Sequence, residues 1–185
     1  MKPQKKPKNY TGSFQETQAA NTCIQMNPIG VVHSPFKERF TAPRQPDFAA
    51  ATAGKITLHR GYNFEQALSD LGTFSHIWVL YWMHLNQGWN PTVMPPRGSD
   101  IRRGLFSTRA PHRPNSIGLS VVKLTTIKKR CLYIEGLDML DGTPVLDIKP
   151  YLPYADAIND ASHGWLDPNA SFAFLSHELE CSHVD

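Results

Sequence analysis

The densest group of side chains able to do chemistry lies in residues 104–120, where arginine, histidine and asparagine alternate with proline. Pro111 and Pro114 remove backbone donors and forbid an ordinary helix or central strand there. We expect a stiff loop, closed by positive φ angles at Asn115 and Gly118. Stiff loops often carry binding groups, and guanidinium groups suit carboxylates and phosphates. A proline-stiffened hairpin connection with solvated arginines is the plainer interpretation.

Two apolar runs must position this loop. Leu105 and Phe106 lead into it as a strand-like entry, and residues 117–124, rich in β-branched side chains, follow it as a strand. A loop held between two strands would present four polar side chains: Arg109, His112, Arg113 and Asn115.

The rest of the chain also consists of short strand patterns. Residues 76–85 are almost wholly apolar and predict a central strand buried on both faces. Asn63 and Gln66 form a capping-box pattern before a short helix over residues 64–71. About seven strands, with no strand–helix–strand repeat, favour an antiparallel barrel or sandwich. The further strands are expected at residues 24–32, 55–59, 131–137 and 145–149.

Charge is distributed unevenly along the chain, although its net value is only +3. Residues 1–134 carry 18 basic and 6 acidic side chains, whereas residues 135–185 carry 1 and 10. A basic half suits a polyanionic partner such as RNA. The alternative is that the acidic tail folds back and neutralises the basic face. The candidate phosphate contacts are Arg102, Arg103 and Arg113.

Composition predicts one main domain with tails. We expect a disordered leader over residues 1–22, a barrel domain over 23–155 and a non-regular acidic C-terminal tail over 156–185, with a short helix near 172–179. No run approaches the ~20 apolar residues of a membrane span. The three cysteines lie far apart, which indicates a reducing cytoplasm, and no metal-binding motif is present.

Four ordered motifs point to a family. Residues 108–118 read Thr-Arg-x-x-x-Arg-Pro-Asn-x-Ile-Gly, and the others occupy residues 29–45, 74–78 and 138–151. Together they resemble the TsaA-like (TrmO, YaeB) tRNA (adenine(37)-N6)-methyltransferases over residues 27–155. The resemblance implies a single antiparallel β-barrel with one or two short helices, completed as a homodimer. It also implies S-adenosylmethionine-dependent N6-methylation of threonylcarbamoyladenosine at position 37 of tRNA.

The resemblance assigns cofactor binding to eleven residues: Pro43, Arg44, Gln45, His76, Ile77, Arg109, Leu119, Asp138, Met139, Leu140 and Asp141. From the residues alone, Asp138 and Asp141 fit a β-turn equally well, and His76 fits a hydrogen-bonded core histidine. His76 and Asp141 are also the candidate bases for removing the N6 proton. A mechanism without a dedicated base is equally open.

Two rival functions remain at this stage. The same barrel could hold the cofactor or RNA as a sensor, without turnover. A metal-dependent hydrolase is disfavoured because the chain has no His-Glu-x-x-His motif and no paired cysteines. A Rossmann cofactor site is likewise unsupported, since no G-x-G-x-x-G follows a strand.

Overall fold

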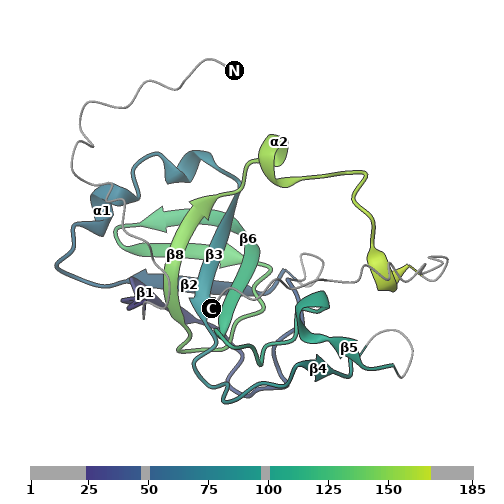
Figure 1. The fold of residues 1–185 in the computed structure, drawn as a ribbon. Coiled ribbons are helices and arrows are strands. Elements are labelled where there is room, and N and C mark those ends of the chain that lie inside the picture. Colours follow the sequence, from purple (N-terminus) through teal and green to yellow (C-terminus); the bar gives the residue numbers. More distant parts are fainter. Residues whose placement is uncertain (1–23, 47–50, 97–100, 168–185) are drawn as a thin grey trace, which may run out of the picture.

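A closed six-stranded antiparallel barrel forms the centre of the computed structural model, which describes residues 24–46, 51–96 and 101–167 (Figure 1). Its strands follow one another in the order β1–β2–β7–β6–β3–β8. The predicted mainly β fold with a single antiparallel barrel is therefore confirmed, and the sandwich is excluded. The strand bounds are β1 Gly30–His33, β2 Ala53–Leu58, β3 His76–Trp82, β6 Ile117–Lys128, β7 Cys131–Glu135 and β8 Pro144–Pro150.

Short elements decorate the barrel. Two of them, β4 (Thr92–Val93) and β5 (Arg103–Gly104), pair as a separate two-stranded sheet. The helices are α1 Phe64–Ala67, α2 Pro153–Asp156 and the 3-10 turns η2 Leu71–Thr73, η3 Leu105–Ser107 and η4 Gly164–Leu166. The predicted leader over 1–22 and the helix near 172–179 lie outside the described residues.

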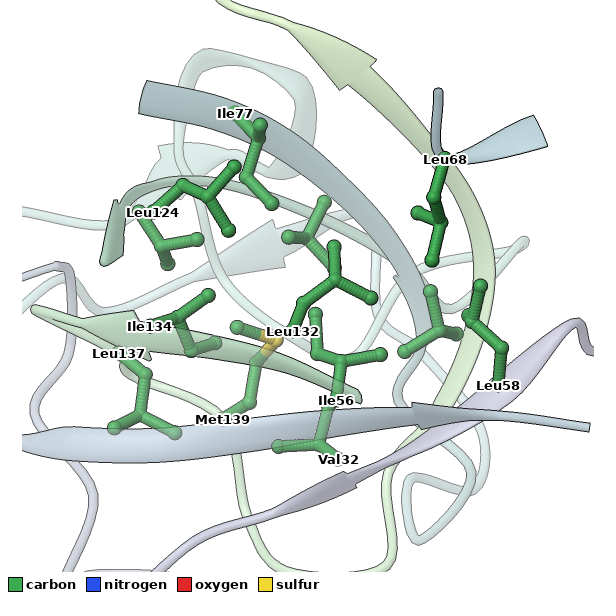
Figure 2. Close-up of a cluster of buried hydrophobic side chains, with 13 residues drawn as sticks. Val32, Ile56, Leu58, Leu68, Ile77, Leu124, Leu132, Ile134, Leu137 and Met139 are labelled. Atoms are coloured by element: carbon green, nitrogen blue, oxygen red, sulfur yellow. The ribbon is translucent and has the colours of Figure 1, made fainter. Parts of the chain in front are cut away.

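Aliphatic side chains fill the barrel because alternate residues of each strand point inward (Figure 2). Val32, Ile56 and Leu132 come from three neighbouring strands, and each is fully buried. Leu137 and Met139, from the connection between β7 and β8, enter the same core. The core therefore fixes the start of the segment that carries Asp138 to Asp141.

The strand β3 is buried on one face only, so the prediction of a doubly buried central strand was wrong. Ile77 and Val79 are fully buried inside the barrel, whereas Trp82 is 48% exposed on the outer face. In a closed barrel only the inner face of each strand meets the core. The outer face of β3 keeps its apolar side chains without a second layer of sheet over it.

A β-bulge interrupts the pairing of β3 with β8. Leu80 lies opposite Asp147, but the next residue, Tyr81, lies opposite Val145, so that Leu146 is the extra residue. An extra residue reverses the alternation of inward and outward side chains beyond it. Val145 consequently points inward and is completely buried.

The helix after β2 is shorter than predicted, and the capping box does not form. Asn63 has φ 55°, and its side chain makes no capping bond to the backbone. Its Nδ2 instead donates to Gln66 Oε1 over 2.7 Å. A capping residue needs an extended backbone to reach the N–H groups of the first turn, which a left-handed Asn63 does not provide. Leu68, just beyond α1, still enters the core.

The connections of the barrel fall into two groups. Those joining β1 to β2, β3 to β6 and β7 to β8 lie at one rim, which we call the site rim. Those joining β2 to β3 and β6 to β7 lie at the opposite rim, the far rim. Figure 1 shows β4 and β5 near the end of β3 at the site rim, and α2 near its beginning.

Candidate functional site

The loop over residues 105–116 lies at the site rim, and we call it the arginine-rich loop. It begins with a 3-10 turn, η3, and not with the predicted strand. Thr108 Oγ1 donates to Leu105 O over 2.8 Å, and Ser107 Oγ donates to Gly104 O over 2.8 Å. These local bonds between hydroxyl and carbonyl groups compete with strand pairing and close the turn. Leu105 is buried, whereas Phe106 is 77% exposed.

The loop closes without the positive φ angles predicted at Asn115 and Gly118, since neither residue has one. The Ile117 N–H donates to Asn115 O over 2.7 Å and forms the final turn. Gly118 serves a different purpose. A Cβ atom there would lie 2.2 Å from ring carbons of Tyr81. Glycine is therefore required for the close approach of the Tyr81 ring and not for backbone freedom.

Arg113 is tied into this loop. Its Nη1 donates to Thr108 O over 3.0 Å, and its guanidinium lies 5.6 Å from the centre of the Phe106 ring. Such contacts hold the loop in shape and leave only part of the guanidinium for a phosphate. RNA binding by Arg113 remains a prediction.

The other two arginines predicted to bind RNA also have partners. Arg102 donates to Thr92 Oγ1 over 3.0 Å and to Thr92 O over 2.8 Å. Arg103 stacks 5.3 Å from the centre of the Trp165 ring, and Trp165 Nε1 donates to Ser107 O over 2.8 Å. Thus Arg102 fastens β5 to β4, and Arg103 meets the returning segment that contains η4.

Asp138 lies in a half-buried polar chain that starts at β3. Ser120 Oγ donates to Asp138 Oδ1 over 2.7 Å. Because the Ser120 proton is used there, Tyr81, whose hydroxyl lies 3.2 Å from Ser120 Oγ, is the donor in that pair. Burial raises the pKa of Asp138, while the Ser120 hydrogen bond and the nearby Arg109 charge oppose that rise. Burial and then the Asp138 charge raise the pKa of Tyr81 to about 12.

Asp141 has different surroundings. Its carboxylate accepts from the Ser34 N–H over 2.9 Å and from Lys37 Nζ over 2.5 Å, and its own N–H donates to Phe36 O over 2.8 Å. The Lys37 bond, followed by the Ser34 bond, lowers the pKa of Asp141. A carboxylate with a lowered pKa is a weak base at neutral pH. Asp141 also fastens the β7–β8 connection to the residues that follow β1.

The residues after β1 also reach the arginine-rich loop. Arg39 Nη2 lies 2.6 Å from His112 Nε2, which joins the two connections at the site rim. Arg44 and Arg109 are exposed, and neither donates a hydrogen bond to another described residue. Two guanidinium groups with free donors at one rim suit a carboxylate ligand. Pro43 and Gln45 flank Arg44 in the same connection.

Four other predicted cofactor residues differ in how they face the site. Ile77 and Met139 are buried in the core, with 0% and 1% of their surfaces exposed (Figure 2). Leu119 is 54% exposed on the outer face of β6. Leu140 is half-buried between Met139 and Asp141.

His76 is not brought together with Arg109 within one chain. It begins β3 at the far rim and pairs with Lys123, whereas Tyr81 pairs with Gly118 at the site rim. Five residues of strand separate His76 from Tyr81 by about 16 Å, at 3.3 Å per residue. The His76 Nδ1 lies 2.9 Å from Ser75 Oγ, and its ring lies 6.4 Å from that of Tyr151.

Sequence reasoning missed Tyr81 and Ser120, which support Asp138. One signal was available. Alternation along residues 117–124 places Ser120 inward, between the inward positions of Gly118 and Val122. A hydroxyl group facing a barrel interior needs a buried partner. The position of Tyr81 depends on the register of β3 against β6, which the sequence does not reveal.

Two kinds of feature are absent from the described residues. In the described ranges no three His, Cys, Asp or Glu side chains come together in the way that metal ligands do. No described helix has both the length and the apolar character needed to cross a membrane.

Comparison with known proteins places this geometry in a family. The family model of the tRNA-methyltransferase O N-terminal domain matches residues 31–157. The chain belongs to this family. The resemblance seen in the four motifs is thereby confirmed.

Relatives in this family have both bacterial and archaeal sources. The tRNA (adenine(37)-N6)-methyltransferase of Escherichia coli K12 is 46% identical over 146 residues, which cover 75% of this chain and 62% of that protein. A probable S-adenosyl-L-methionine-binding protein of Methanothermobacter thermautotrophicus is 45% identical over 135 residues, covering 73% of this chain and 95% of that protein.

A solved structure of the family has the same fold. The crystal structure of TrmO from Pseudomonas aeruginosa matches with a TM-score of 0.66 and 43% identity, over 77% of this chain and 62% of that one. The chain thus spans less than two thirds of the length of the bacterial relatives that it matches, including the E. coli protein.

Proposed function

We propose that this chain is an S-adenosylmethionine-dependent tRNA methyltransferase that acts on N6 of adenine 37. The observation that carries the proposal is the Arg109 charge close to the Ser120-supported Asp138, with Arg44 in another connection at the same rim of a barrel of this family. The similarity to the tRNA (adenine(37)-N6)-methyltransferase of E. coli supports the same reaction. The proposed substrate is adenine 37 carrying the threonylcarbamoyl group, in the cytoplasm.

The donor set at the site rim fits the proposed cofactor. Guanidinium groups of Arg44 and Arg109 suit a carboxylate, and the Asp138 carboxylate suits an ammonium or sulfonium group. The Gln45 amide and the backbone groups beside Met139 suit an adenine edge. The remaining proposed contacts in the same chain are Pro43, Leu119, Leu140 and Asp141. His76 and Ile77 lie at the far rim, so we propose that they contact a cofactor held at the site rim of a partner subunit. When bound, S-adenosylmethionine supplies the methyl group.

Positioning is the main catalytic contribution that we assign to the protein. Methyl transfer is an in-line displacement, and holding the reacting atoms in line supplies most of the acceleration. Asp141 is a weak base because its carboxylate accepts from Lys37 and Ser34. His76 lies at the far rim of the same chain. We therefore favour a mechanism without a dedicated base in which Arg109 and Asp138 fix the geometry.

The test is transfer of a labelled methyl group to purified tRNA. We expect label in tRNA that carries threonylcarbamoyladenosine and much less in tRNA that lacks it. Arg109→Ala should weaken cofactor binding about 10- to 150-fold, as expected for one charge-assisted contact. Equal labelling of both tRNAs would reject the proposed substrate. Cofactor binding without any transfer would reject the enzyme and favour the sensor.

We also propose a homodimer, built on the outer face of β3 and β6. Trp82, Ile117 and Leu119 are 48%, 39% and 54% exposed there, and the pairing of Trp82 with Ile117 makes them one patch. Exposed apolar patches of this kind mark interaction surfaces. A second copy over this patch would also bring a partner surface next to Leu119, which is one of the proposed cofactor contacts.

Light scattering at micromolar concentration tests the dimer. We expect a dimer for the wild type and a monomer for Ile117→Asp, because a carboxylate would be buried in the interface. Ile158→Asp is the matched control, since Ile158 is 71% exposed and follows α2 outside the patch. A monomeric wild type with full methyl transfer would overturn the dimer. The proposed division into a leader (1–22), a barrel (23–155) and a tail (156–185) can be tested on the same samples by limited proteolysis.

A further inference from the structure

The outer face of β1, β2 and β7 carries a row of basic and aromatic side chains. In the strand register, His33 lies opposite Lys55, and Lys55 lies opposite Tyr133. All three point away from the core, because their neighbours Val32 and Ile56 point into it. Tyr133 is 37% exposed. Three neighbouring strands thus place two basic side chains and an aromatic ring side by side.

This row forms the floor of an open hollow of about 500 Å³. Lys37 and Asp141 stand at its border, and Ala53 and Gly54 complete its wall. The hollow is therefore continuous with the β7–β8 connection at the site rim. Its full lining is His33, Ser34, Pro35, Lys37, Ala53, Gly54, Lys55, Tyr133 and Asp141.

The charge around the hollow is positive. Lys37 pairs with Asp141, so that these two charges cancel. Lys55 has no ion pair with another described residue. Lys128 Nζ lies 5.6 Å from the centre of the Tyr133 ring and adds a second uncompensated charge. An aromatic ring between two lysines that form no ion pair within the described ranges is the arrangement that suits a base with its flanking phosphates.

The hollow also lies close to the proposed methyl-transfer site. Asp141 borders it, and Asp138 is three residues earlier in the chain, which sets their Cα atoms at most about 11 Å apart. A strand of RNA covers that distance in a few nucleotides, at roughly 3.4 Å per nucleotide in a helix. A nucleotide in the hollow would therefore be a near neighbour of an adenine held beside Asp138.

We propose that this hollow binds a single-stranded RNA nucleotide that flanks the methylated adenine, with its base stacked on Tyr133 and its phosphates on Lys55 and Lys128. The proposal rests on the proposed function. The base takes the place of the Lys128 ammonium over the ring, and that ammonium moves to a phosphate. The three arginines predicted earlier to bind RNA are held by loop contacts, so this face offers the freer cations.

Binding of the full chain to unmodified and modified tRNA across a salt series tests the proposal. Tyr133→Ala should weaken binding about tenfold at every salt concentration, and Tyr133→Phe should restore it, because stacking needs the ring and not the hydroxyl. Lys55→Ala should lower the log–log salt slope by about 0.7–1. Arg60→Ala is the matched control. It removes the same charge beyond the far-rim end of β2 and should leave affinity and slope unchanged.

Two further measurements separate this site from the cofactor site. Calorimetry with S-adenosylmethionine and no RNA should give the same affinity, within twofold, for wild type, Tyr133→Ala and Lys55→Ala. Methyl transfer by Tyr133→Ala should show a raised KM for tRNA and an unchanged kcat. Weaker cofactor binding by these variants would assign the hollow to the cofactor and overturn the proposal.

Unchanged tRNA affinity in Tyr133→Ala and Lys55→Ala would also overturn the proposed nucleotide site. The positive face would then have to bind a different anionic partner. A wild type that binds tRNA without transferring a methyl group would reject the proposed activity. The tRNA affinities of Tyr133→Ala and Lys55→Ala would still show whether the hollow binds RNA.

Discussion

Asp138 and Asp141 belong to one connection of the barrel, yet their surroundings push their pKa values in opposite directions. Asp138 stands over the end of the core, where burial disfavours its charge and raises its pKa. Asp141 stands outside the wall, where Lys37 and the Ser34 N–H stabilise its charge and lower its pKa. Their positions relative to the barrel wall therefore decide which carboxylate is available to a cationic ligand and which one holds loops together.

The two carboxylates should also respond to pH with opposite signs. The stability that Asp141 contributes is present above its unfolded pKa of about 3.9 and is lost as the pH falls through its lowered folded pKa. Asp138 favours the folded state most when it is protonated. Its contribution is complete below the unfolded pKa and is lost as the pH rises through the raised folded pKa.

The largest expected effect is on the Asp138 side of this comparison. Asp138→Asn keeps the shape of the side chain and removes its charge, so cofactor affinity should fall about 10- to 150-fold. Stability at pH 7 should hold or rise, because a charge is no longer buried. Calorimetry and thermal unfolding measure the two quantities. Asp147→Asn, which breaks an exposed pair with Lys149, is the control. Unchanged cofactor affinity in Asp138→Asn would show that Asp138 does not bind the cofactor.

Gly118→Ala should also disturb the surroundings of Asp138, because it displaces Tyr81, which contacts Ser120. The added Cβ would lie 2.2 Å from the ring, so the ring or the strand must move. We expect a loss of about 1–3 kcal/mol of unfolding free energy, typical of overpacking, together with weaker cofactor binding. Urea denaturation gives the first value. Gly104→Ala has open space around it and should be nearly neutral. Equal stability of the two variants would show that Tyr81 is free to move.

Asp141→Asn tests the other side of the comparison. It should cost about 1 kcal/mol of unfolding free energy at pH 7, because the Lys37 charge pair is lost while the Ser34 N–H keeps an acceptor. The difference from wild type should shrink as the pH falls through the lowered pKa of Asp141. Denaturation at a series of pH values measures it. A difference that persists in strong acid would mean that the carboxylate charge is not what holds the loops.

The smallest effects should come from Ser120→Ala and Tyr81→Phe. Ser120→Ala removes a hydrogen bond that lowers the pKa of Asp138, so that pKa should rise further, and the acid limb of cofactor binding should move to higher pH. At neutral pH we expect an affinity loss of about two- to tenfold. Tyr81→Phe, one bond farther away, should shift the limb in the same direction and by less. Calorimetry over a pH series shows both. An unmoved acid limb in Ser120→Ala would remove Ser120 from its positioning role.

The antiparallel strands of the barrel were predictable because their evidence is local, whereas the choice of a barrel over a sandwich came from the family motifs. Short alternating runs and a turn at Asp141 and Gly142, where φ is +78°, are readable in one chain. The 3-10 turn at Leu105 was missed because hydroxyl groups two and three residues later decide it. The single buried face of β3 was missed because an apolar run looks alike in a doubly covered sheet and in a barrel whose outer face is open.

The candidate site was predictable only as a collection of residues. The motifs named Arg44, Arg109 and Asp138, and the fold places them at one rim. The register of β3 against β6 decides which other residues join the site. The pairing of Tyr81 with Gly118 brings the Tyr81 hydroxyl to Ser120, and the start of β3 sets His76 apart. Strand register depends on contacts between distant parts of the chain, which no single stretch of sequence contains.

The bulge at Leu146 determines which side chains of the connection before it face the core. If the ladder between β3 and β8 ran on without a bulge, Leu146 would lie opposite Tyr81, and the side chain of Val145 would turn from the core to the solvent. Every residue back to Asp138 would then have to rotate or slide to keep Met139 in the core and Asp138 near Ser120. Lengthening or shortening the chain between Gly136 and Leu146 by one residue should therefore be far harder to accommodate than the same change between α2 and η4, where residues 157–163 are exposed.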